Sequence, residues 1–159
     1  MSTVKYYDWS YHQARTRPNK VAVKEVSTGR ETTYGQLEER SCRLASWLQN
    51  KGVKKGDRVA ILIHNCTEVF ELEFACAKIG AIELPLNWRL TKPELEYILN
   101  DSSPEVLIYG SNFADTAKAL TTDCSINNSL EINDEDQNNE YEQALKENID
   151  FDVVETTHD

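Results

Sequence analysis

The chain has 159 residues, of which 40% are hydrophobic and 28% charged, and its formal net charge at pH 7 is −10. A chain of this length can bury about 70% of the surface that it exposes when unfolded, which is enough for one domain with one core. No apolar run approaches the roughly 20 residues that cross a bilayer, and the first residues lack the apolar stretch of a secretion signal. We therefore expect a soluble, cytoplasmic protein with no transmembrane segment.

The negative charge is concentrated at the C-terminal end. Residues 131–159 hold eleven of the 27 acidic residues and one Lys or Arg, Lys146, whereas residues 1–130 hold 16 acids and 16 bases. We therefore expect a folded part over residues 1–130 and a separate acidic segment over 131–159. We interpret the acidic segment as a solvated connector, and the alternative is a docking arm for a basic partner. Because no face of clustered Lys and Arg is indicated, we expect no nucleic-acid partner.

The cysteines and histidines are too widely spaced to predict a metal site. No CxxC pair occurs, so we interpret the cysteines as free, buried thiols. A histidine at a strand end could act as an acid or base, but a structural, hydrogen-bonded role is the preferred interpretation. The residues concerned are Cys42, Cys66, Cys76 and Cys124, and His12, His64 and His158.

The first elements expected are a short helix and a hairpin. Asp8 can cap a helix that ends near Arg17, because Pro18 disfavours helical geometry in the residue before it. The runs 21–26 and 30–34 have strand character and flank a Ser-Thr-Gly turn. These features predict an antiparallel hairpin directly after the first helix.

Three longer helices follow. In a capping box, a hydroxyl and a second polar side chain satisfy the free backbone N–H groups at a helix start, and two such boxes are present. They are Thr33 with Gln36, and Thr91 with Glu94. The helix after the first box is expected to end at Gly52, and a further helix over 67–79 ends at Gly80.

The runs 58–63, 81–86 and 106–109 are apolar on both faces, as buried parallel strands are. Strands that alternate with helices through right-handed crossovers predict an open, largely parallel sheet with helices on both faces. The expected fold class is therefore α/β, with a small helix and hairpin at the N-terminal end. The ligand crevice of such a sheet lies at the C-terminal ends of its strands. The residues expected there are His64, Asn65, Asn87 and Gly110.

The sequence contains no familiar catalytic motif. Its glycines nowhere form GxG, and neither a P-loop, a GxSxG elbow nor an HExxH helix occurs. We therefore predict no catalytic residue and no metal ligand. Glu71 and Glu73 lie two residues apart on one helix, so they face different directions and are expected to be solvated. Trp88 and Arg89 could hold an anionic ligand at the crevice, and the alternative is a packed indole and a surface ion pair.

Two stretches resemble the AMP-forming adenylating enzymes. Residues 33–59 resemble the opening pattern TYxEL…L…GVxxGDRVA, and residues 65–109 resemble the second core stretch of that family. The matching residues are Thr33, Tyr34, Gln36, Leu37, Ala45, Leu48, Gly52, Val53, Gly56, Asp57, Arg58, Val59, Ala77, Gly80, Ala81, Pro85, Asn87 and Arg89. The likeness is clearest over residues 8–113 and thins beyond them, down to ETTHD at 155–159, which resembles the approach to the family's next motif. The run PLNWRL at 85–90 is similar to fatty-acyl and related acyl-CoA ligases, and EYEQAL at 140–145 resembles a helix of their variable stretch.

The resemblance implies that residues 1–130 are an incomplete N-terminal α/β subdomain of an acyl-CoA ligase. The implied parent reaction joins a fatty or other carboxylic acid to CoA through an acyl-adenylate, and it uses ATP, magnesium and CoA. The loop rich in Thr, Ser and Gly that holds the ATP phosphates is expected just beyond residue 159. We therefore predict that this chain alone needs no cofactor and catalyses nothing. Its candidates for cofactor binding are Asn65, Asn87 and Arg89.

Two hypotheses follow from that resemblance. In the first, the chain is a fragment of a longer ligase, its partner is the remainder of that polypeptide, and apolar surface left uncovered leads to self-association. In the second, it is a standalone, non-catalytic binding or regulatory module derived from such a ligase, with the acidic segment bound to a partner. The first is preferred because the likeness continues to the last residue.

Overall fold

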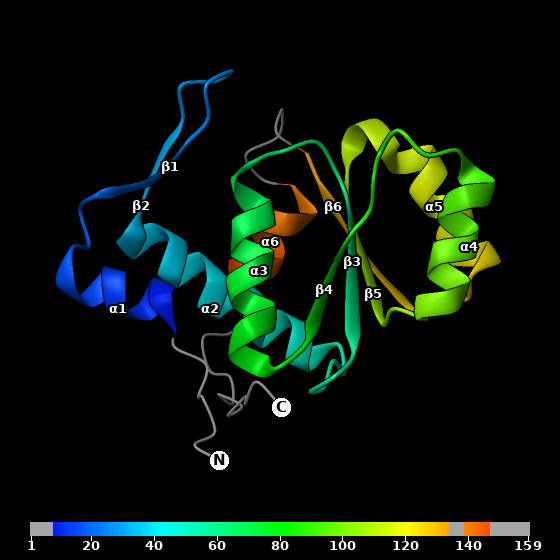
Figure 1. The fold of residues 1–159 in the computed structure, drawn as a ribbon, viewed down its shortest axis with the longest axis horizontal. Coiled ribbons are helices and arrows are strands. Elements are labelled where there is room, and N and C mark those ends of the chain that lie inside the picture. Colours follow the sequence, from blue (N-terminus) through cyan, green and yellow to red (C-terminus); the bar gives the residue numbers. More distant parts are fainter. Residues whose placement is uncertain (1–7, 134–138, 147–159) are drawn as a thin grey trace, which may run out of the picture.

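The computed structural model describes residues 8–133 and 139–146, and Figure 1 shows how their helices and strands are arranged. The larger sheet has four strands in the order β4-β3-β5-β6, and every neighbouring pair is parallel. The smaller sheet is an antiparallel pair of β1 and β2. The strands are β1 (Val21–Lys24), β2 (Glu31–Thr33), β3 (Arg58–Leu62), β4 (Ile82–Pro85), β5 (Val106–Gly110) and β6 (Asn128–Ile132). The predicted α/β class and parallel sheet are confirmed.

The helices are α1 (Trp9–Thr16), α2 (Tyr34–Asn50), α3 (Thr67–Ile79), α4 (Lys92–Ser102), α5 (Ala114–Asp123) and α6 (Glu140–Lys146). The predicted starts of α1, α2 and α4 are confirmed by their caps. Asp8 Oδ1 accepts a hydrogen bond from the backbone N–H of Tyr11 at 3.0 Å, and Thr33 N–H donates to Gln36 Oε1 at 2.9 Å. No pattern in the sequence predicted α5 or β6.

The core has two halves because successive side chains of a strand point to opposite faces. Val59 and Ile61 of β3 pack against one face together with buried residues of α2, α3 and α6. Ala60 and Leu62 pack on the opposite face with buried residues of α4 and α5. Figure 1 shows these two groups of helices on either side of the sheet. None of the helices in the described ranges is long and apolar enough to span a membrane.

The acidic segment enters this core. β6 runs across residue 130, where we expected the folded part to end, and α6 packs beside α2 with Tyr141, Ala144 and Leu145 buried. The interpretation as a solvated connector is therefore wrong for residues 140–146. Whether a subdomain of a longer ligase ends at residue 130 stays a prediction. Residues 134–138 and 147–159, including the expected approach to the phosphate-binding loop and His158, lie outside the described residues.

Candidate functional site

The C-terminal ends of β3 and β5 lie side by side in the middle of the sheet. The chain leaving β3 leads through α3 to β4 on one side, and the chain leaving β5 leads through α5 to β6 on the other side. Open α/β sheets bind ligands at such a topological switch point. A pocket with a volume of about 170 Å³ opens there, which we call the switch-point pocket. Its lining includes Thr28, His64, Asn65, Ser111, Asn112 and Phe113.

Gly110 ends β5 and lines this pocket. A Cβ atom at this position would lie 2.9 Å from Cγ1 of Ile63, closer than side-chain carbons approach one another. The residue is therefore required for close packing of the two strand ends and not for an unusual backbone angle. The prediction that residue 110 lies at the crevice agrees with the position of the pocket.

A row of aromatic side chains crosses the strand ends. The ring of His64 meets Trp88 edge to face at a centroid distance of 4.5 Å, and it lies 5.0 Å from the ring of Phe113. The guanidinium carbon of Arg89 lies 4.0 Å from the centroid of the Trp88 ring, a cation–π distance. The row thus joins the segments that follow β3, β4 and β5 and ends in an exposed cation.

The predicted cofactor-binding residues are divided between two places. Asn65 lines the switch-point pocket and is exposed. Asn87 and Arg89 are exposed beyond β4, where the backbone N–H of Arg89 donates to Oδ1 of Asn87 at 3.1 Å. They do not line the pocket, and Trp88 links them to it through its contact with His64. Their role in binding stays a prediction.

The hairpin closes one side of the pocket. Glu25 lines the pocket, and its Oε1 accepts hydrogen bonds from the backbone N–H of Thr67 at 2.9 Å and from the hydroxyl of Thr67 at 2.8 Å. Cys66, at the N-cap of α3, makes no capping hydrogen bond with its own side chain. Burial of Glu25 would raise its pKa, but hydrogen bonds from Thr67, Arg30 and Thr28 outweigh it and lower the pKa to about 2. The carboxylate therefore caps α3.

Arg30 adds a second contact between the hairpin and the first turn of α3. Its Nη2 donates to both carboxylate oxygens of Glu68, at 2.8 and 2.9 Å, and also to Oε1 of Glu25. Glu68 is 3% exposed, so this contact is shielded from solvent on one side. No pattern in the sequence predicts these contacts, because Glu25 and Arg30 lie about 40 residues from Thr67 and Glu68, on different elements.

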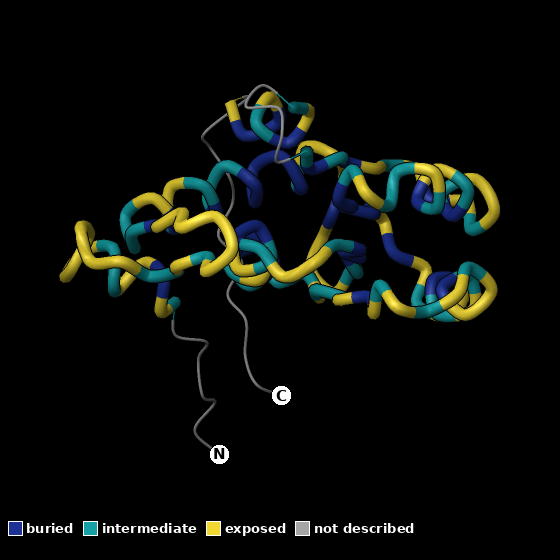
Figure 2. Tube along the Cα trace, turned by 90° about the horizontal axis from the view of Figure 1, so that it is seen from above, coloured by how far each residue is buried: buried dark blue, intermediate teal, exposed yellow. Residues whose placement is uncertain are grey.

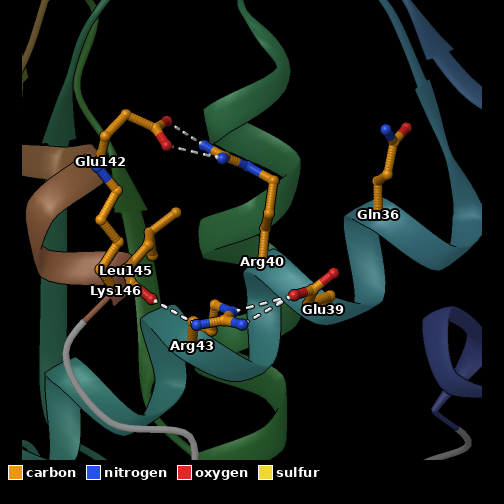
Figure 3. A pocket seen from close by; sticks show the side chains of 7 residues that line it. All are labelled: Gln36, Glu39, Arg40, Arg43, Glu142, Leu145 and Lys146. Carbon is orange, nitrogen blue, oxygen red and sulfur yellow. Dashed lines mark hydrogen bonds and ion pairs between the residues drawn. The ribbon is translucent and has the colours of Figure 1, made fainter. Parts of the chain in front are cut away.

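A second group of polar side chains joins α2, α3 and α6. Arg40 donates to Glu71 through Nε at 2.6 Å and to both oxygens of Glu142 at 2.6 and 3.0 Å. The hydroxyl of Tyr141 donates to Oε2 of Glu71 at 2.7 Å. Figure 3 shows Arg40 reaching across to Glu142, and beside it Arg43, which donates to the backbone carbonyl of Leu145 at 3.2 Å. A groove with a volume of about 310 Å³ lies between α2 and α6.

The expectation that Glu71 is solvated is wrong. Its side chain is 1% exposed, whereas Glu73 is exposed as expected. Burial raises the pKa of Glu71, and the charge and hydrogen bond of Arg40 oppose that rise. Glu71 points into the junction of three helices, which the spacing of residues along α3 alone does not show.

The cysteines of the described chain are all free. Cys76 is buried as expected, and Cys42, Cys66 and Cys124 are half-buried. Burial raises the pKa of Cys42 to about 12, so its thiol is protonated at neutral pH. Within residues 8–133 and 139–146, no group of three or more His, Cys, Asp and Glu side chains could hold a metal ion.

Comparison with known proteins places the chain in a family. Residues 10–158 match the model of the family described as AMP-binding enzyme. A feruloyl-CoA synthase from an Amycolatopsis species is 43% identical over 112 residues, which cover 70% of this chain and 22% of the relative. The long-chain-fatty-acid–CoA ligase FadD13 of Mycobacterium tuberculosis is 39% identical over 118 residues, which cover 74% of this chain and 24% of the relative.

Solved structures agree with these relatives. The N-terminal domain of FACL13 from Mycobacterium tuberculosis has a TM-score of 0.81 and 31% identity, and the match covers 95% of this chain and 38% of that domain. This structural match covers 95% of the chain, so it extends over α5 and β6, which lie beyond residues 8–113, and over α6, which contains the run EYEQAL. By contrast, the chain spans less than a quarter of the length of the feruloyl-CoA synthase and of FadD13. Because the family model matches almost the whole length of the chain, the chain belongs to the AMP-binding enzyme family, among the acyl-CoA ligases.

Proposed function

We propose that the chain supplies the N-terminal α/β portion of an ATP-dependent acyl-CoA ligase and is inactive alone. The observation that carries this proposal is the family match over residues 10–158, combined with a length that is a fraction of that of the relatives. The parent enzyme would activate a fatty or other carboxylic acid with ATP and magnesium as an acyl-adenylate, and then transfer the acyl group to CoA. Feruloyl-CoA synthase and long-chain-fatty-acid–CoA ligase among the relatives support an acyl acid as the substrate class.

The lining of the switch-point pocket supports inactivity. Transfer of a phosphoryl group depends on cations and backbone N–H groups held around the phosphates. The described lining contains the carboxylate of Glu25 and several neutral polar groups, but no Lys or Arg. The negative charge of the ATP triphosphate and of the attacking carboxylate would find no compensating Lys or Arg there. The cations of the parent enzyme would come from the remainder of its polypeptide.

The exposed residues at the strand ends would then contribute to the parent's crevice. Arg89 is exposed and fixed against Trp88, so its charge is directed by the aromatic row instead of being free to turn in solvent. We propose that Asn65, Asn87 and Arg89 contact an anionic part of ATP or CoA in the complete enzyme.

The experiment has two parts. The purified chain is incubated with ATP, magnesium, CoA and either ferulate or a long-chain fatty acid, and released pyrophosphate and AMP are measured. We expect neither product. In a chimaera, this chain replaces the aligned N-terminal residues of the Amycolatopsis feruloyl-CoA synthase, and we expect feruloyl-adenylate to form. The synthase without its N-terminal segment is the matched control and should be inactive.

Each result has a consequence. Pyrophosphate release by the chain alone would contradict inactivity, and a folded but inactive chimaera would contradict a role in the ligase. The alternative is a standalone binding module derived from such an enzyme. It predicts that the chimaera fails while the chain alone forms a stable complex with a basic partner through the acidic segment.

A further inference from the structure

Exposed hydrophobic side chains gather at the N-terminal end of the fold. Four of the seven large hydrophobic residues that are exposed in the described part of the chain lie within residues 9–26. They are Trp9, Tyr11, Val21 and Val26, with 59%, 49%, 40% and 94% of their surface exposed. We call residues 9–26 the N-terminal arm; it comprises α1, the segment that follows it, and β1 with the start of its turn.

The same arm carries a positive charge on a protein whose net charge is −10. Residues 9–24 contain no Asp or Glu, although 27 acids are present in the chain. Their Arg and Lys side chains, Arg15, Arg17, Lys20 and Lys24, are all exposed, and Lys24 is paired with Glu31 of β2 at 2.6 Å. The guanidinium of Arg15 lies 5.5 Å from the centroid of the Tyr11 ring and donates to its hydroxyl at 2.8 Å. Aromatic and basic groups are thus in direct contact on this surface.

The arm is held in a fixed orientation by its inner side. Nζ of Lys78, which is 4% exposed, donates to Oδ2 of Asp8 at 2.6 Å and to the carboxylate of Glu38 at 2.8 and 2.9 Å. The hydroxyl of Ser10, which is buried, donates to Oε2 of Glu38 at 2.6 Å. Because Ser10 faces the body, the helical positions of Trp9 and Tyr11 face outward. In Figure 1, α1 and β1 lie at the end of the molecule away from β5 and β6, and Figure 2 shows that this end is largely exposed.

We infer that the N-terminal arm binds the surface of an anionic lipid bilayer without crossing it. Indole and phenol rings prefer the headgroup region, where the ring is shielded and its polar tip stays hydrated. Lys and Arg are attracted to anionic headgroups, while their apolar stems lie along the interface. An acidic protein would also complement the charge, but the interleaving of the bases with Trp9, Tyr11 and Val21 favours an occupant that accepts apolar groups between its charges. The inference is independent of the proposed ligase function.

The test measures sedimentation of the full chain with sucrose-loaded vesicles. We expect binding to vesicles of phosphatidylcholine with 30–40% phosphatidylglycerol (roughly a third anionic lipid), weak binding to pure phosphatidylcholine, and release at high salt. Neutralising the four bases by Arg15→Gln, Arg17→Gln, Lys20→Gln and Lys24→Gln should weaken partitioning about fivefold for each of the first three. The effect of Lys24→Gln should be smaller, because Glu31 balances the charge of Lys24.

A matched variant removes the same number of charges elsewhere. Lys51, Lys54, Lys55 and Lys118 are exposed and lie outside the arm, so their replacement by Gln changes the net charge equally. We expect this control to keep most of the binding. Equal loss in both variants would show attraction by overall charge and would overturn the inference, as would equal binding of the wild-type chain to neutral and anionic vesicles.

A second readout follows insertion and not only charge. Brominated lipids quench a Trp that enters the bilayer, and Trp9 is 59% exposed whereas Trp47 is 6% exposed. We expect quenching in the wild type that is lost in Trp9→Phe, with helix content by circular dichroism unchanged. Undiminished quenching in Trp9→Phe would overturn the inference. Binding to polyglutamate but not to vesicles would identify the arm as a surface for acidic proteins and would overturn it too.

Discussion

The hydroxyl of Tyr141 donates a 2.7 Å hydrogen bond to Oε2 of Glu71, and both side chains are 1% exposed although they lie 70 residues apart. The other oxygen of the carboxylate accepts from Nε of Arg40. One carboxylate therefore connects α2, α3 and α6. Because the groups are buried, the loss of one donor would leave a polar atom without a partner in a medium that cannot replace it.

Tyr141→Phe removes that donor and almost nothing else. We expect the free energy of unfolding to fall by about 1–3 kcal/mol, because the buried Oε2 of Glu71 loses the donor that Tyr141 supplies. Urea denaturation followed by circular dichroism measures the change. Tyr97→Phe is the control, since Tyr97 is 75% exposed, and it should change stability by less than about 0.5 kcal/mol. Equal effects of the two substitutions would contradict the proposed importance of the buried hydrogen bond.

We expect the stability of the fold to depend on pH through Glu83 on β4. Its Oε1 is buried and has no hydrogen-bond partner, and burial, reinforced by the charge of Glu73, raises the pKa of Glu83 from 4.5 to about 7. A raised pKa means that the folded protein holds this proton more tightly than the unfolded chain. The contribution to stability is complete below pH 4.5 and is lost as the pH rises through 7.

The measurement is the melting temperature of the wild type and of Glu83→Gln between pH 4 and 8. We expect the advantage of the variant over the wild type to grow as the pH rises, because glutamine carries no charge. Glu73→Gln removes only the neighbouring charge and should reduce the effect in part. Parallel curves for the wild type and Glu83→Gln would show that this carboxyl does not titrate in that window.

Gly110→Ala tests the close approach of the strand ends. The new Cβ would meet Cγ1 of Ile63 at 2.9 Å, so the Ile63 side chain or the strand ends must shift, at a cost of about 1–3 kcal/mol. The double variant with Ile63→Ala removes the obstructing atom, so its destabilisation should be smaller than the sum of the two single effects. Additive effects in urea denaturation would show that the two positions are not coupled.

Self-association is expected from the two strands at the edges of the sheet. Among the described strands, β4 and β6 each pair with one neighbour only, and β4 carries Ile82, which is 51% exposed. Open edges pair readily with other chains. We expect dimers whose proportion rises with concentration in analytical ultracentrifugation, and fewer dimers in Ile82→Lys. Tyr97→Lys on α4 is the control and should associate like the wild type; a monomer at every concentration would contradict the prediction.

Local patterns predicted most of the fold correctly. The helix at 67–79 was predicted with the bounds that α3 has, because Gly80 adopts the left-handed conformation that ends it. The capping boxes located α2 and α4 because each depends on side chains three residues apart. α5 was missed since Thr and Asp, poor helix formers, make up half of it. β6 was missed because three of its five residues are polar, and only its parallel pairing with β5 defines it.

The candidate site was predicted less completely. The strand order places His64, Asn65 and Gly110 at one pocket, as the rule for parallel sheets predicts from the sequence. The roles of Glu25 and Glu71 depend on partners 42 and 31 or more residues away, so they follow from tertiary structure and not from spacing. Glu71 shows this: its position along α3 predicted a solvated carboxylate, but the side chain is buried where α2, α3 and α6 meet.

The capping of α3 by Glu25 restricts how the hairpin can vary. Surface turns normally tolerate inserted residues, because the entropy of closing a longer loop rises slowly with its length. Here the turn must hold a carboxylate at hydrogen-bond distance from Thr67 while Arg30 reaches Glu68. An insertion between Glu25 and Arg30 would separate the two anchors, so this exposed turn should be as intolerant of a change in length as a buried strand.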